Sequence, residues 1–68
     1  MTFTLEIEQE ADGRWIAEVP ELPGTLAYGG SADEATARAK ALALRVLADR
    51  LERGETEADL GAITFAAA

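Results

Sequence analysis

The chain has 68 residues, of which 49% are hydrophobic, and a formal net charge of −7. This length allows one domain, residues 1–68, with a thin core, and the absence of cysteine and histidine excludes disulfides, thiolate metal sites and histidine-based catalysis. Because no stretch is long enough to cross a bilayer and the N-terminus is acidic where a signal peptide is basic, we expect a cytoplasmic protein that does not contact membranes.

Two strands and a tight turn are predicted at the start of the chain. Residues 3–8 and 14–19 alternate between apolar and polar side chains, and residues 11–13 separate them with Ala-Asp-Gly. A two-residue turn at Asp12-Gly13 would mix the two faces of the hairpin. A three-residue turn, with Gly13 in the left-handed conformation, keeps the apolar side chains on one face and is therefore predicted.

This turn also predicts the pairing of the two strands. Ile7 should lie opposite Ala17, with both side chains on the apolar face. On the other face, Glu6 should lie opposite Glu18, a pair of like charges that weakens the hairpin.

A rigid corner follows, in the sequence Pro-Glu-Leu-Pro-Gly at residues 20–24, because proline restricts both itself and the residue before it. Residues 25–28 then form a short third strand. Ser31 and Glu34 have the spacing of a capping box, in which each side chain bonds to the other's backbone at a helix start.

We predict a helix from Ala32 to about Arg53, ended by Gly54, with ion pairs such as Arg45–Asp49 on its exposed face. Residues 55–61 read as an acidic loop, and residues 62–66 as a fourth strand. The right-handed crossover rule makes this last strand parallel to the third. The predicted fold is therefore α+β with order βββαβ: a four-stranded mixed sheet of order 3-2-1-4 with one long helix on one face.

The helix carries two apolar stripes. The sheet-facing stripe is predicted to contain Ala35, Ala39, Leu42 and Val46. The second stripe lies on nearly the opposite side, in the half of the helix that should extend past the sheet. We expect it to form a homo-oligomer interface, in a dimer or a tetramer, through Leu44, Leu47, Ala48 and Leu51.

Charge is unevenly distributed along the chain. Residues 1–34 contain eight carboxylates and one arginine, and so carry the whole net charge of −7, whereas residues 35–68 contain five acids and five bases. An acidic surface repels nucleic acid and attracts basic proteins. The bases of the helix point in several directions, so direct nucleic-acid binding is not expected.

No catalytic residues are predicted. Ser31, the only serine, is accounted for by helix capping, and no histidine can activate it. No metal site is assigned, although Glu6, Glu8 and Glu10 share one strand face, as carboxylates do in two-metal nucleases. A metal-dependent nuclease therefore stays open as a weaker alternative.

The ordered set of motifs resembles the N-terminal domain of the HicB antitoxin family. The resemblance covers residues 3–65 and implies a partial RNase H-like fold without catalysis. Members of that family neutralise HicA, a small basic RNA-cleaving toxin, by covering it. The matching residues are Asp12-Gly13 in the turn, Ala17 and Pro20, Leu22-Pro23-Gly24 at the corner, and Gly29, Ser31, Glu34 and Ala35 at the helix start.

Charge and resemblance together predict an antitoxin module that sterically neutralises a small basic toxin. The expected partner-binding residues are Glu6, Glu8, Glu18 and Glu21, which would steer the partner electrostatically. The alternative from a different class is a structural or ligand-binding domain that has no toxin partner.

Overall fold

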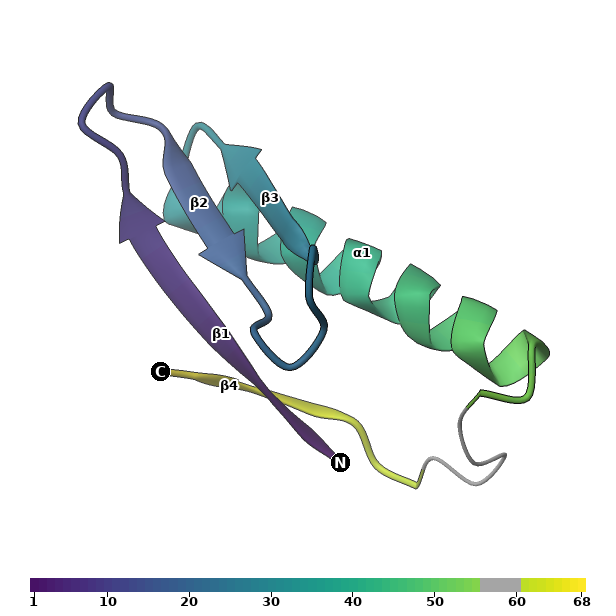
Figure 1. Ribbon diagram of the computed structural model, residues 1–68. Helices are drawn as coiled ribbons and strands as arrows, with labels where there is room; N and C mark the ends of the chain where they lie inside the picture. Colours follow the sequence, from purple (N-terminus) through teal and green to yellow (C-terminus); the bar gives the residue numbers. More distant parts are fainter. Residues whose placement is uncertain (56–60) are drawn as a thin grey trace.

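The computed structural model describes residues 1–55 and 61–68, and it confirms the predicted α+β architecture. One helix lies on one face of a four-stranded sheet of order β3-β2-β1-β4, in which β4 runs parallel to β1 and the other pairs are antiparallel (Figure 1). Residues 56–60 of the expected acidic loop lie outside the described residues. The elements are β1 (Thr2–Gln9), β2 (Trp15–Glu18), β3 (Leu26–Gly29), α1 (Ala32–Glu52) and β4 (Thr64–Ala67).

The hairpin has the predicted three-residue turn and register. Gly13 has a φ of 93°, and its amide donates to the Glu10 carbonyl at 3.0 Å. Ile7 pairs with Ala17, and Glu6 pairs with Glu18. The left-handed glycine thus sets which face every side chain of β1 and β2 occupies.

The corner between β2 and β3 closes on its own backbone. The Leu22 amide donates to the Val19 carbonyl and the Thr25 amide donates to the Leu22 carbonyl, both at 3.0 Å. The side chains of Val19, Leu22 and Thr25 are buried. The strand after the corner begins at Leu26, one residue later than predicted.

The start of α1 packs very closely against β3. A Cβ atom added at Gly29 would lie 2.6 Å from the Ala35 amide nitrogen. Ala35, Ala39 and Ala43 are fully buried along the same helix. Ser31 caps the helix as expected, accepting from the Glu34 amide at 3.1 Å. The Glu34 carboxylate differs from the predicted capping box, because it accepts from the amide of Gly30, at 3.3 Å, and not from that of Ser31.

The predicted position of Leu47 was wrong. The sequence pattern places Leu47 on the second, outward-facing apolar stripe of the helix, but its side chain is only 4% exposed and belongs to the same core cluster as Phe3. The buried residues of α1 follow every fourth position, Ala35, Ala39, Ala43 and Leu47. Such a row is inclined to the helix axis, so the buried side of the helix changes along its length. Leu44, Ala48 and Leu51 remain exposed.

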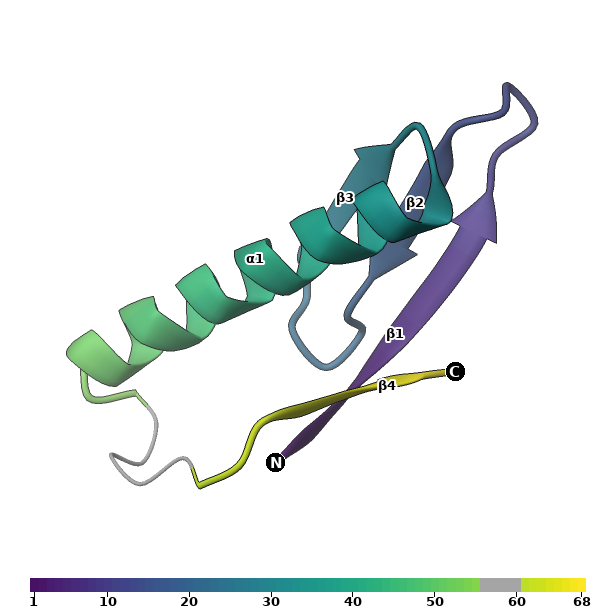
Figure 2. The same cartoon turned by 180° about the vertical axis from the view of Figure 1, so that it is seen from behind.

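The C-terminal half of α1 extends past the ends of β2 and β3, as expected from its length (Figure 2). The expected Arg45–Asp49 ion pair is not formed, because Asp49 instead pairs with Arg53, 3.3 Å away at the C-cap.

At the edge of the sheet opposite β3, β4 places Phe65 against Phe3, with ring centroids 5.8 Å apart. No helix in residues 1–55 or 61–68 is both long enough and apolar enough to cross a membrane.

We predict that Leu47→Ala lowers the free energy of unfolding by about 2–5 kcal/mol, because it leaves a cavity in the core. Leu26→Ala is the matched control, since Leu26 is 38% exposed, and it should change stability by less than about 0.5 kcal/mol. Urea denaturation followed by circular dichroism measures both. Equal losses would show that Leu47 is not a core residue.

The contact between α1 and β3 predicts a second effect. Gly29→Ala should destabilise the fold by about 1–3 kcal/mol, because the added methyl meets backbone rather than a movable side chain. Gly30→Ala is its neighbouring control, since a Cβ there has nothing within 4 Å. If the two variants unfold at the same urea concentration, the close approach does not limit stability.

Candidate functional site

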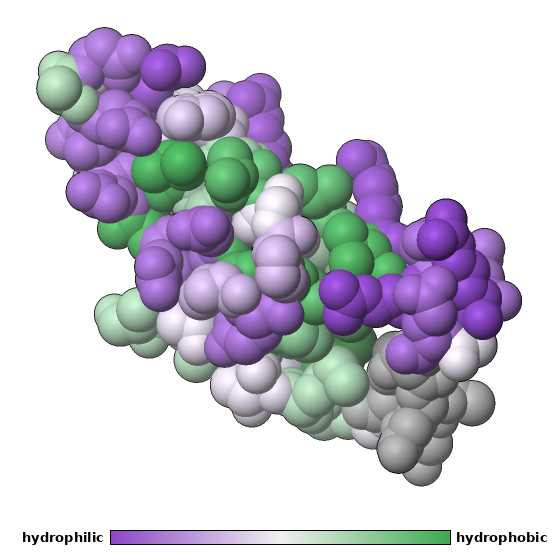
Figure 3. Space-filling view, viewed as in Figure 1, coloured by the Kyte–Doolittle hydropathy of each residue, from purple (hydrophilic) through white to green (hydrophobic). Residues whose placement is uncertain are grey.

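The sheet face opposite α1 is the candidate site, and we call it the outer face. No element of residues 1–55 or 61–68 forms a second layer over it (Figure 1). Hydrophilic side chains lie along β1 and around the hairpin, and hydrophobic side chains gather over β2 and β3 (Figure 3). Two rows of paired residues cross it from β1 to β3. These rows are Glu6–Glu18–Leu26 and Glu8–Ile16–Tyr28.

The outer face contains carboxylates that form no ion pair with the described residues. Glu6 and Glu18 are directly opposed, which at such positions separates their Cα atoms by roughly 5.5 Å. Neither they nor Glu8 form an ion pair with any other described residue. Opposed like charges weaken a sheet, so this arrangement costs stability without any compensating contact in the described chain.

Exposed apolar groups lie beside these carboxylates. Leu26 is 38% exposed next to Glu18, and Tyr28 is 39% exposed next to Ile16. The Arg14 guanidinium lies 4.6 Å from the centre of the Tyr28 ring. Sequence reasoning missed this apolar part of the face. The available signal was an apolar residue at positions 16, 26 and 28, where the alternation of a one-sided sheet calls for polar ones.

Glu21, predicted to contact a partner, is exposed and forms hydrogen bonds within the chain. Its carboxylate accepts from the Thr4 amide at 3.0 Å and 3.1 Å and from the Thr4 hydroxyl at 2.7 Å. Continuing the hairpin register would place Pro20 opposite Thr4, but the chain turns away there, and the Glu21 carboxylate takes the Thr4 amide in place of a ladder partner. These hydrogen bonds, that of the hydroxyl above all, lower the pKa of the Glu21 carboxyl.

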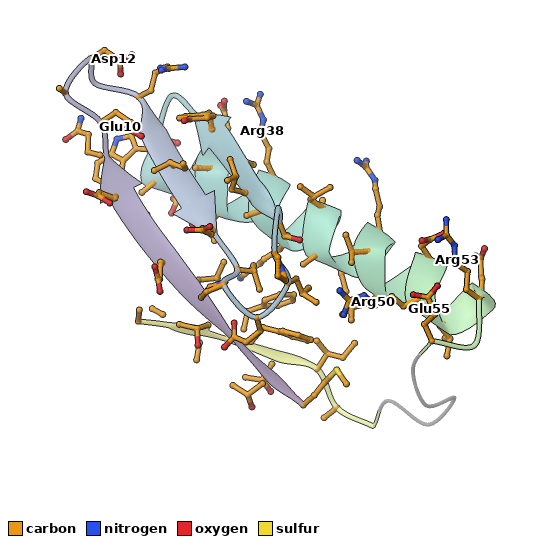
Figure 4. The ribbon with its side chains drawn as sticks, viewed as in Figure 1. Glu10, Asp12, Arg38, Arg50, Arg53 and Glu55 are labelled. Atoms are coloured by element: carbon orange, nitrogen blue, oxygen red, sulfur yellow. The ribbon has the colours of Figure 1, made fainter. Side chains whose placement is uncertain are left out.

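The free edge of β3 is partly covered by the helix. The Arg38 guanidinium donates to the Tyr28 carbonyl at 3.0 Å and pairs with Glu34 at 3.1 Å, while Glu34 also accepts from the Gly30 amide. Arg38 rises from α1 beside β3, whereas Arg50 and Arg53 lie toward the other end of the helix (Figure 4). Charged groups at an edge hinder strand addition, so a partner would meet the face rather than this edge.

The described part of the outer face has neither a pocket nor a group of residues that could hold a metal ion. No group of three or more carboxylates among residues 1–55 and 61–68 is arranged to hold a metal ion, and this part of the chain has no pocket. Glu6, Glu8 and Glu10 do share one face of β1, but successive members are roughly 7 Å apart along the strand. The arrangement is suited to contacting another surface.

Comparison with models of known protein families, with curated proteins and with solved structures finds no match. The residues of the outer face, the fold and the motifs of the corner and helix start are therefore the features that bear on function.

The lowered pKa of Glu21 predicts a pH dependence. A carboxyl whose pKa falls on folding stabilises the protein above its ordinary value of about 4.5, and this contribution is lost as the pH falls through the folded pKa. Glu21→Gln should therefore be less stable than the wild type at pH 7, and the difference should shrink below pH 4.5. Urea denaturation at each pH measures it, with Glu8→Gln as the control that keeps the Thr4 contacts. A difference that does not vary with pH would contradict this role for the Glu21 charge.

Proposed function

We propose that the outer face binds a small basic RNA-cleaving protein of the HicA type and covers it, which makes this chain a HicB-like antitoxin module. The observation that carries the proposal is the set of unpaired carboxylates directly beside exposed apolar side chains. Glu6, Glu8 and Glu18 form the charged part of this surface, and Leu26 and Tyr28 form the apolar part.

The electrostatics favour a basic partner. A lysine or arginine placed between Glu6 and Glu18 would replace a repulsion by two attractions, so the pair would gain on binding what it costs in the free chain. The charge of residues 1–34 would also accelerate encounter with a basic protein, in a salt-dependent way.

The apolar part of the outer face supplies binding energy that the charges alone do not. Protein interfaces typically have an apolar centre with aromatic residues and a polar rim, and most binding energy comes from the centre. Leu26 and Tyr28 are neighbours of Glu18 and Ile16 on the same rows, so one partner can contact both kinds of group.

The motif resemblance supports this partner class. The HicB-like motifs imply a partial RNase H-like fold, and the observed β3-β2-β1-β4 order with one helix agrees with that expectation. A protein that cleaves RNA needs a basic surface for the phosphates. An acidic face that binds this surface would exclude RNA sterically, and no catalytic group of the antitoxin is required.

The proposal predicts that Glu6→Gln/Glu18→Gln weakens binding of a HicA-type toxin roughly tenfold at low salt, with a shallower salt dependence. The control is Glu52→Gln/Glu55→Gln, which removes the same charge from the far end of the helix and should leave affinity nearly unchanged. Titration calorimetry at several salt concentrations measures both. The outer-face variant should also unfold no more easily than the wild type, because a repulsion is removed, so lost affinity would not reflect unfolding.

An RNA-cleavage assay tests the function itself. Equimolar wild-type chain should suppress cleavage by the toxin, and Leu26→Ala/Tyr28→Ala should suppress it less. Equal affinity of both glutamine variants would remove the outer face from the proposal. Absence of any binding or inhibition would favour the alternative of a domain without a toxin partner.

A further inference from the structure

We infer that α1 forms an antiparallel dimer with α1 of a second copy, through an apolar row that we call the outward stripe. All of its members are exposed, on the side of the helix away from the core. The stripe consists of Ala37, Ala41, Leu44, Ala48 and Leu51.

The spacing of the outward stripe is that of a helix-pairing seam. Its members alternate between steps of four and three residues, which is the heptad repeat of paired helices. Leu44 is 48% exposed and Leu51 is 38% exposed, so the described part of the chain leaves both leucines incompletely buried. The three alanines allow two helices to approach closely, with each leucine opposite an alanine.

Charge argues for a second copy on this surface and against one on the sheet. Residues 1–34 carry the whole net charge of −7, so two outer faces would repel each other. The helix contains four acids and four bases. The surface best suited to self-association is therefore the helix, whose C-terminal half also stands clear of β2 and β3 (Figure 2).

The order of charges along α1 favours the antiparallel arrangement. Residues 36–46 contain three bases and no acid, whereas residues 47–55 contain three acids and two bases. A parallel pair would place the two basic segments side by side. An antiparallel pair places each beside the acidic segment of the other chain. Arg45 and Glu52 form no ion pair with described residues, so both are available for this contact.

An alternative place for a second copy is the free edge of β4, which carries no charged side chain. The backbone bonds from Thr64 to Met1 and from Ala68 to Leu5 direct even-numbered residues toward β1. The Ala67 amide therefore points to the free edge, and Ala67→Pro removes it without breaking the pairing with β1. This variant separates the two possibilities.

The test is the mass in solution, measured by size-exclusion chromatography with light scattering. The wild type should have the mass of two chains, and Leu44→Glu and Leu51→Glu should halve it while keeping the helical circular dichroism. Leu26→Glu, an equally exposed leucine on the outer face, and Ala67→Pro should both keep the mass of two chains. A monomeric wild type, or halving by either control and not by the stripe variants, would overturn the inference.

Orientation is tested by oxidation, because the chain has no cysteine of its own. Leu44→Cys and Ala48→Cys proteins, mixed and oxidised, should yield mainly the mixed disulfide when the helices are antiparallel. Each protein alone should form little disulfide. Efficient homodisulfides of both Leu44→Cys and Ala48→Cys, with no mixed product, would show a parallel pair and overturn the antiparallel arrangement.

Discussion

The close approach of α1 to β3 is the constraint on which the rest of the structure depends. Gly29 leaves no space for a Cβ against Ala35, and the next buried helix residues are alanines, so the helix lies almost directly on the strand. Larger core side chains are then accommodated elsewhere, as with Phe3 of β1 and Leu47. Because one helix covers the sheet in the described part of the chain, the buried residues lie on one face of the sheet. No other described element packs on the opposite face, which can therefore contact other molecules.

The acidic residues of the strand half have two different physical situations. Glu21 is held by three hydrogen bonds from Thr4. Its carboxylate accepts from the Thr4 amide where the backbone pairing of β1 and β2 ends at Pro20, so its charge contributes to the fold. Glu6 and Glu18 are opposed and have no such contacts among the described residues. Local arrangements that cost stability without compensation are concentrated at functional sites. The charge of Glu21 is therefore used within the fold, whereas those of Glu6 and Glu18 have no such use among the described residues.

The order of the elements and the hairpin register could be predicted because short-range rules determine them. Gly13 fixes the turn, and the period-two pattern then decides which residues face inward. Leu47 could not be placed in the same way, because a helical wheel assigns one buried side to the whole helix. In the structure, the row of buried residues is inclined to the helix axis, and this inclination depends on how the helix crosses the twisted sheet. The role of Glu21 was also inaccessible, since it depends on the corner bringing residue 21 beside Thr4. Sequence patterns therefore predicted the fold more completely than the use of each exposed side chain.

The segregation of charge allows the two proposed contacts to coexist. The outer face and the outward stripe lie on opposite sides of the molecule, because the sheet and α1 form its two layers. A dimer joined through the stripes would bring its nearly neutral helices together and keep its two acidic faces apart, on the outside. That arrangement lowers the repulsion between copies while leaving every outer-face carboxylate accessible. Two copies would then present two separate sites for a basic protein, each formed by one chain, and self-association would not compete with partner binding.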